Sequence, residues 1–224
     1  MAWNVDQTYG FLRFLIRKNQ AGAISATDFF YAWNSEQYAM HDDLVGKWQR
    51  ASNGKLGANS GFLENRVITT KMAPFMIPAT LTIASGDANK PSDFIYQLAI
   101  RINGKEVKSI NHNQIATVND SVIDPPLESS DTYYVVTYED YYHFLPISVT
   151  EAELDYIAAP EDVVWAFTLN GQNRQVYDAA NSVQPKWNQN TIIEITRRAL
   201  KSLGVSFKDS DFAQYGTSVI NTGD

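Results

Sequence analysis

The histidines and their neighbouring carboxylates are the residue types best suited to acid–base or metal chemistry. His41 precedes Asp42 and Asp43, and this triplet could be drawn as a metal site. Consecutive residues on a helix point to different faces, so the triplet fits a polar helix face better. His112 lies in a polar, turn-like run and His143 lies among tyrosines, where a hydrogen-bonded histidine is the simpler interpretation.

Other sequence signatures of catalysis are missing. The chain has no cysteine, which excludes a thiolate nucleophile and a cysteine-based zinc site. No His-x-x-x-His, Gly-x-Ser-x-Gly, Walker A or Gly-x-Gly-x-x-Gly pattern occurs. Adjacency in Glu139-Asp140 or Glu161-Asp162 does not place two carboxylates on opposite sides of a substrate bond. We therefore expect no catalytic residue, no metal, no cofactor and no enzymatic activity; an enzyme using paired carboxylates is the remaining alternative of that class.

A tyrosine-rich stretch at 133–144 is a candidate binding surface. Tyrosine offers a large contact area for little loss of side-chain entropy, although some of these rings could equally line a core. Near the C-terminus, Asp209 could cap a last helical turn that carries two further aromatic residues. The predicted interface residues are Tyr133, Tyr134, Tyr141, Phe212 and Tyr215.

Charge argues against tight binding of nucleic acid. The net charge is −7, whereas nucleic-acid binders normally carry a basic patch. Close basic groups occur at Arg17-Lys18 and at Arg197-Arg198-Lys201, and both fit the solvated faces of helices. An acidic surface would instead let DNA pass without binding it.

The sequence shows no pattern typical of a signal peptide or a membrane span. Residues 1–6 lack a basic region followed by an apolar run, so no signal peptide is predicted. No apolar run approaches the roughly 20 residues that a membrane span requires. We expect a protein made and assembled in a cytoplasm, without a membrane partner.

The first 50 residues predict two helices joined by a short turn, an αα-hairpin. Tyr9, Leu12 and Ile16 form an apolar stripe at helical spacing. Ser25, followed three residues later by Asp28, is typical of a capping box at the start of the second helix.

The middle of the chain is organised around residues 94–102, where each even position is large and apolar. Strict alternation predicts a strand with one buried face. Asn103-Gly104 follows and suits a type I′ turn, so a β-hairpin is predicted. A helix remains the alternative, because Phe94, Leu98 and Ile102 are also four residues apart.

The predicted organisation is α+β, with helices at both ends and an antiparallel β-rich middle. The β-branched run at 67–72 is interpreted as the first strand, and Asn170-Gly171 as the turn of a second hairpin. Asn188 is the predicted N-cap of a C-terminal helix. The predicted regions are a helical hairpin at 1–50, a flexible loop at 51–65, a β-rich region at 66–180, and a helix with an extended tail at 181–224 that packs with 1–50.

The stretch Pro91-Ser92-Asp93-Phe94-Ile95 resembles the Leu-Pro-x-Asp-Phe stretch of tail tubular A and adaptor proteins of short-tailed phages. The residue before the proline differs, because Lys90 stands where that family has an apolar residue. Further short runs are similar to structural proteins of crAss-like phages of Bacteroidetes. These runs are Asp124-Pro125-Pro126, Phe144-Leu145-Pro146, 154–160, 164–167 and 192–205.

The resemblance implies a non-catalytic ring protein of the virion neck or tail, in about twelve copies beneath the portal. Its partners would be copies of itself, the portal, other ring or tail proteins, and DNA passing through the lumen without specific binding. It also implies that the helices form the ring body and that the β region projects outward or toward the neighbouring ring.

A second class of function stays open on the residues alone. Aromatic side chains at sheet surfaces can stack on sugars, which would make the chain a non-catalytic ligand- or glycan-binding module. The candidate stacking residues are Tyr133, Tyr134, Tyr141 and Trp165.

Overall fold

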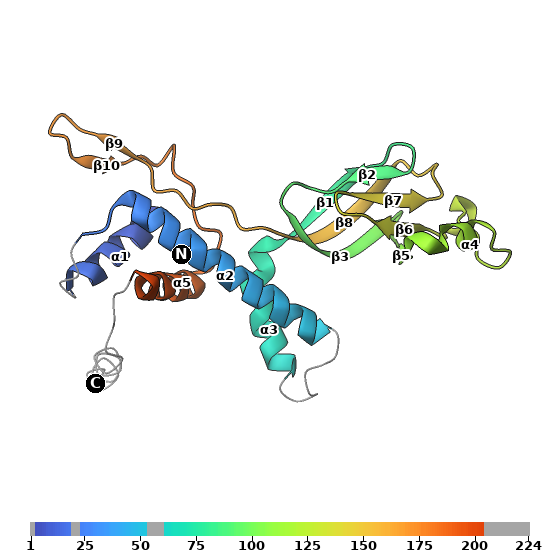
Figure 1. Cartoon of the computed structure of the whole chain (residues 1–224), viewed down its shortest axis with the longest axis horizontal. Helices are drawn as coiled ribbons and strands as arrows, with labels where there is room; N and C mark the ends of the chain where they lie inside the picture. The colour runs from blue at the N-terminus through green and yellow to red at the C-terminus, as the bar shows by residue number, and fades with distance from the viewer. Residues whose placement is uncertain (1–2, 19–22, 53–60, 204–224) are drawn as a thin grey trace. The chain divides into compact units, whose positions relative to one another are not determined.

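The computed structural model describes residues 3–18, 23–52 and 61–203 and confirms the α+β class. The chain divides into two compact units. Their residues can be found in Figure 1 from its colour bar, which follows the residue number. We call 1–72 with 160–224 the helical unit, and 73–159 the β unit. The β unit is therefore a single insertion between two halves of the helical unit.

Four helices build the helical unit. They are α1 (Val5–Lys18), α2 (Ala26–Ser52), α3 (Gly61–Met72) and α5 (Gln189–Ser202). Helix α5 packs against both α2 and α1, and α3 packs against α2. The C-terminal helix therefore closes onto the N-terminal helices, as predicted. No helix among the described residues is long and apolar enough to span a bilayer.

Both predicted N-caps are confirmed. Ser25 Oγ accepts a hydrogen bond from the backbone N–H of Asp28 at 3.1 Å, and the Asp28 carboxylate accepts one from the backbone N–H of Ser25 at 3.1 Å. Asn188 Oδ1 accepts the backbone N–H of Thr191 at 2.9 Å. These bonds satisfy N–H groups that the first turn of a helix leaves without partners.

The core of the helical unit forms where the apolar stripes of the helices meet. The predicted apolar stripe on α1 is buried, and the apolar side of α5 packs against α1 and α2. The fully buried side chains of this core include Val5, Leu12, Phe29, Trp33, Ile192, Ile195, Ala199 and Leu200.

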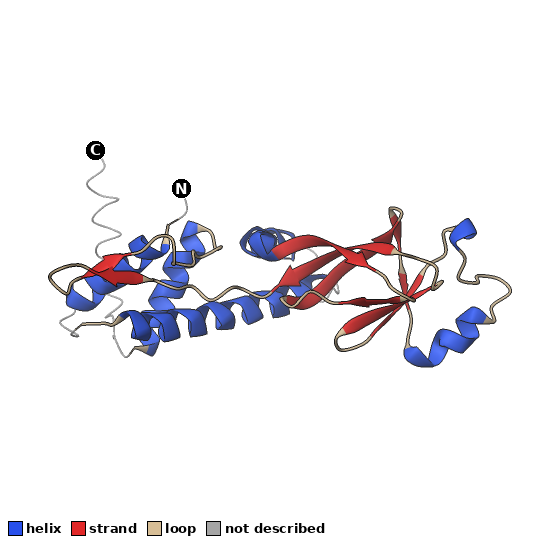
Figure 2. Ribbon diagram, turned by 90° about the horizontal axis from the view of Figure 1, so that it is seen from above, coloured by secondary structure: helices blue, strands red, loops and turns tan. Residues whose placement is uncertain are grey.

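The β unit contains two four-stranded sheets, with strand orders β1-β8-β3-β4 and β2-β7-β6-β5 (Figure 2). All pairings are antiparallel except β5 with β6. The strands are β1 (Met76–Thr82), β2 (Asp87–Asn89), β3 (Phe94–Ile102), β4 (Lys105–Glu106), β5 (Lys108–Ser109), β6 (Tyr134–Thr137), β7 (Tyr141–Leu145) and β8 (Glu151–Ala158). Short helical elements connect them: η1 (Ala73–Phe75), η2 (His112–Gln114), α4 (Ile115–Asn119) and η3 (Glu128–Ser130).

One apolar core joins the two sheets. Ile100 and Leu154 come from the first sheet, and Val135, Tyr142 and Phe144 come from the second. All five are 2% exposed or less. The sheets therefore pack face to face as a sandwich.

The predicted turn at Asn103-Gly104 is confirmed. Both residues have positive φ, 52° and 75°, as a type I′ turn requires. The returning strand β4 is only two residues long, because β5 (Lys108–Ser109) passes into the other sheet.

Three predictions are wrong. The run at 67–72, interpreted as a strand, is part of α3 (Gly61–Met72). The predicted 51–65 loop includes residues of α2 and α3, while 53–60 lie outside the described part. The β-rich region at 66–180 does not form one unit, because 160–180 belong to the helical unit. There, β9 (Phe167–Leu169) and β10 (Gln175–Tyr177) form the predicted second hairpin.

Candidate interaction surfaces

Two predicted interface tyrosines belong to the core of the β unit. Tyr133 is 2% exposed, and its hydroxyl accepts a hydrogen bond from Asn103 Nδ2 at 3.2 Å. Tyr134 is 6% exposed, and its hydroxyl donates to the backbone oxygen of Asp124 at 2.9 Å. Burial, followed by the nearby Asp124 side chain, raises the pKa of Tyr134. The prediction that these two rings form an interface is therefore corrected to a packing role.

Tyr141 is partly exposed, as an interface residue must be. Its ring stacks on Tyr138 with centroids 4.5 Å apart and planes 10° from parallel. His112 Nδ1 lies 2.5 Å from the Tyr138 hydroxyl. We call these three residues the Tyr138 cluster; Tyr138 and His112 were not singled out as binding residues from the sequence. Phe212 and Tyr215 lie outside the described residues.

Lys90 supports the backbone beneath the Tyr138 cluster. Its Nζ donates to the backbone oxygens of Tyr138 and Glu139, at 2.5 and 2.9 Å. It also lies over the rings of Phe94 and Tyr142, 4.9 and 5.2 Å from their centroids. Burial lowers the pKa of this ammonium. The residue that departs from the phage adaptor pattern therefore fixes the loop between β6 and β7.

An apolar tip stands at the end of the loop that follows α4. Val122 and Ile123 are each 96% exposed. The next residue, Asp124, is paired with Lys108, which lowers the pKa of Asp124. Two adjacent aliphatic side chains with almost no contacts are unusual on a folded surface, which makes this tip a candidate contact site.

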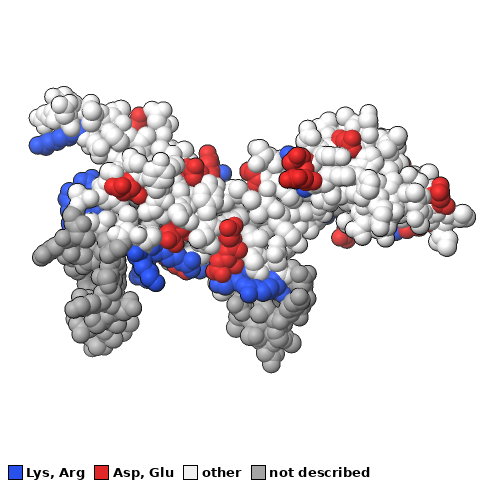
Figure 3. All heavy atoms as spheres, viewed as in Figure 1, with Lys and Arg blue, Asp and Glu red and all other residues white. Residues whose placement is uncertain are grey.

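Charge is unequally divided between the two units. The β unit contains twelve Asp and Glu and four Lys and Arg, a net charge of −8. The helical unit contains thirteen acidic and fourteen basic residues, a net charge of +1. Figure 3 shows prominent Lys and Arg groups over the helices. The acidity of the whole chain is therefore a property of the β unit.

The histidines occupy separate environments. His41 is buried, with its ring 6.3 Å from that of Trp187, whereas the side chain of Asp42 is 83% exposed. His143 Nδ1 lies 2.6 Å from Asp87 Oδ1. Within the described residues, no group of three His, Asp or Glu side chains could hold a metal ion.

The β9–β10 hairpin exposes apolar side chains. Phe167, Leu169 and Val176 are 38%, 60% and 46% exposed. Among residues 3–18, 23–52 and 61–203, both strands pair only with each other. At the base, Trp165 stacks on Phe167 and on Tyr177, with ring centroids 5.6 and 6.2 Å apart. Trp165 is itself 7% exposed, so the predicted sugar-stacking role does not fit its place in the structure.

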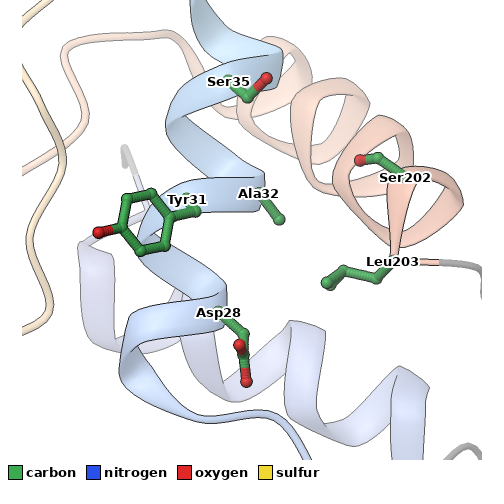
Figure 4. Close-up of a pocket in the computed structure, with 6 residues that line it drawn as sticks. All are labelled: Asp28, Tyr31, Ala32, Ser35, Ser202 and Leu203. Carbon is green, nitrogen blue, oxygen red and sulfur yellow. The ribbon is translucent and has the colours of Figure 1, made fainter.

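A groove lies between α2 and α5, with a volume of about 480 Å³ (Figure 4). Its lining residues are Asp28, Tyr31, Ala32, Ser35, Ser202 and Leu203. Tyr31 is 68% exposed and Leu203 is 36% exposed. Hydrogen bonds from Ser25 lower the pKa of Asp28, so the groove carries an ionised carboxylate at neutral pH.

Comparison with known proteins adds no family to these observations: no family model matches the chain, and no curated protein matches it.

Proposed function

We propose that the chain is a structural protein of a short-tailed bacteriophage virion, a ring subunit of the head–tail neck or tail. It extends the DNA channel below the portal and docks the next tail component. Its partners are copies of itself, the portal and other ring or tail proteins. It is assembled in the host cytoplasm and performs no catalysis.

The observation that carries this proposal is the apolar tip at Val122 and Ile123, each 96% exposed. Leaving two such side chains in water gives up about 1.5–3 kcal/mol each relative to burial. A protein that works as an assembly subunit recovers this free energy when the tip is covered. The tip therefore supports docking on a neighbouring component.

The charge distribution supports the same proposal. A net charge of −7 on each chain makes the assembled ring acidic, and an acidic ring repels the phosphates of a passing duplex. Repulsion keeps DNA mobile, whereas a basic surface would retain it. Short runs along the chain resemble phage neck proteins, and this resemblance is the reason for proposing a neck or tail ring in particular.

The direct experiment is to locate the protein in purified virions. Antibody labelling and negative-stain imaging should place it in a ring of cyclic symmetry between head and tail. Finding it free in the infected cell and absent from particles would sink the proposal.

A pair of substitutions tests the tip. Ile123→Asp should leave the chain folded and incorporated but block attachment of the next component, because it places a charge where an apolar contact forms. Val67→Asp is the matched control, because Val67 is 56% exposed in α3. Equal tail attachment in both variants would argue against docking through the tip.

A further inference from the structure

The β9–β10 hairpin has the properties of an arm. A two-stranded hairpin is marginally stable by itself in water, and within the described part of the chain no third strand pairs with it. Leu169 is 60% exposed and lies on the same face as its cross-strand partner Gln175. Arg174 lies in the exposed connection between the strands. The far end of the hairpin thus presents an apolar side chain beside a cation.

The base of the hairpin is held firmly. The Trp165 indole N–H donates to Asp6 Oδ1 of α1 at 2.9 Å, and its ring lies 4.5 Å from that of Tyr9. On the other strand, the Tyr177 hydroxyl accepts a hydrogen bond from Gln184 Nε2 at 2.9 Å. The arm therefore projects from a fixed support, and little entropy remains to be lost when it binds.

The groove between α2 and α5 offers complementary chemistry. Tyr31, Ala32 and Leu203 provide apolar contact area, and Asp28 provides an ionised carboxylate at one end (Figure 4). The groove is open to solvent along its length, so a side chain of another copy can reach it. Leu169 matches the apolar walls, and Arg174 matches the charge of Asp28.

We infer that the β9–β10 hairpin of one copy binds in the α2–α5 groove of a second copy. This inference rests on the proposed function and specifies its lateral contact. In Figure 1 the hairpin lies on the far side of α1 and α2 from α5, so the hairpin of the same chain does not fill its own groove. The contact joins two different surfaces, and repeated contacts of this kind form a ring when the rotation between neighbouring copies closes. The purified chain associates with itself through this contact at high concentration.

The absence of cysteine makes a cross-linking test specific. One copy carries Leu169→Cys and a second, of different mass through a tag, carries Ser35→Cys in the groove wall. After mixing and mild oxidation, these two copies should form a disulfide-linked heterodimer. The matched control is Thr168→Cys, because Thr168 pairs with Val176 and points to the other face of the hairpin. It should give at least about tenfold less heterodimer with Ser35→Cys, because its sulfur faces away from the groove when Leu169 enters it.

A second measurement does not depend on disulfide geometry. Sedimentation equilibrium should show self-association that Leu169→Asp weakens by at least about tenfold. Arg174→Glu should weaken it as well, whereas Arg174→Lys should retain it, because the charge is kept.

Three results would overturn the inference. They are a chain that stays monomeric at every concentration, equal cross-linking from Leu169→Cys and Thr168→Cys, and self-association that is lost on removing 204–224 but not in Leu169→Asp. The last would assign the groove to the C-terminal segment. A ring found in virions together with any of these results would leave the proposed function intact, whereas cross-linking without incorporation into particles would reject only the function.

Discussion

The Trp33 indole N–H in α2 donates a hydrogen bond to Thr196 Oγ1 in α5 at 3.2 Å, where both residues are fully buried. Thr196 in turn donates to the backbone oxygen of Ile192 at 2.7 Å. These bonds join the N-terminal and C-terminal parts of the helical unit through one side-chain hydroxyl.

Replacing Thr196 with valine should destabilise the helical unit by about 1–3 kcal/mol, because the buried indole N–H of Trp33 loses its acceptor. Urea unfolding followed by tryptophan fluorescence measures this unit alone, since all five tryptophans belong to it. Thr70→Val is the control: Thr70 makes the same bond to the fourth residue before it, at 2.8 Å, on an exposed surface. If both variants unfold at the same urea concentration, the bond to Trp33 contributes nothing.

Replacing Tyr142 with phenylalanine should stabilise the β unit by about 1 kcal/mol. Tyr142 is fully buried, and its hydroxyl has no hydrogen-bond partner among the described residues. Tyr134→Phe should instead destabilise the β unit, because it removes the hydrogen bond to the Asp124 backbone oxygen. Circular dichroism is the appropriate measurement, because the β unit contains no tryptophan. A loss of stability in Tyr142→Phe would contradict the expectation.

Stability of the β unit should fall at alkaline pH, partly through Tyr156. Burial and then the hydrogen bond to Asp93 raise the pKa of Tyr156 from 10.0 to about 12. Folding therefore favours the neutral phenol. This contribution is complete below pH 10 and is lost as pH rises toward 12, with a slope of up to about 1.4 kcal/mol per pH unit.

The measurement is urea unfolding between pH 8 and pH 11, followed by circular dichroism, for the wild type and Tyr156→Phe. The variant should show a shallower alkaline loss of stability. Tyr31→Phe, which removes an exposed hydroxyl, should follow the wild type. A steeper loss in Tyr156→Phe would reverse the assigned direction of the pKa shift.

Two glycine-to-alanine substitutions should have opposite effects on the stability of the fold. Gly104 has φ of 75° in the type I′ turn, so alanine there should cost about 1 kcal/mol. Gly46 lies inside α2, and an added Cβ would meet no atom within 4 Å, so alanine there should stabilise by up to about 1 kcal/mol. Thermal unfolding of both variants tests this pair, and equal signs would contradict it.

The sequence predicted elements whose signals are local. The strand β3, the turn at Asn103-Gly104, the second hairpin and the helix caps at Ser25 and Asn188 all depend on neighbouring residues, and all are confirmed. The run at 67–72 misled because its β-branched residues favour strands. Burial of Ile68 and Met72, four residues apart, and the 2.9 Å ion pair between Lys71 and Glu194 of α5 instead favour α3.

The candidate interaction surfaces were less predictable because their properties depend on distant residues. Tyrosine content gave no means of separating buried Tyr133 from partly exposed Tyr141, since the opposite sheet decides which ring is covered. The groove at Tyr31 depends on a helix more than 150 residues further along the chain. No pattern within a short window could have predicted it.

The insertion of the β unit sets an order of events during synthesis. Residues 73–159 form one continuous segment, so they can fold as soon as they leave the ribosome. Helices α1, α2 and α3 emerge earlier but must wait for α5, whose Ile192, Ile195 and Leu200 complete their core. One wall of the groove, at Ser202 and Leu203, is translated later still. A nascent chain therefore lacks a complete groove until α5 has emerged, so in the proposed self-association half-made copies could not join through it.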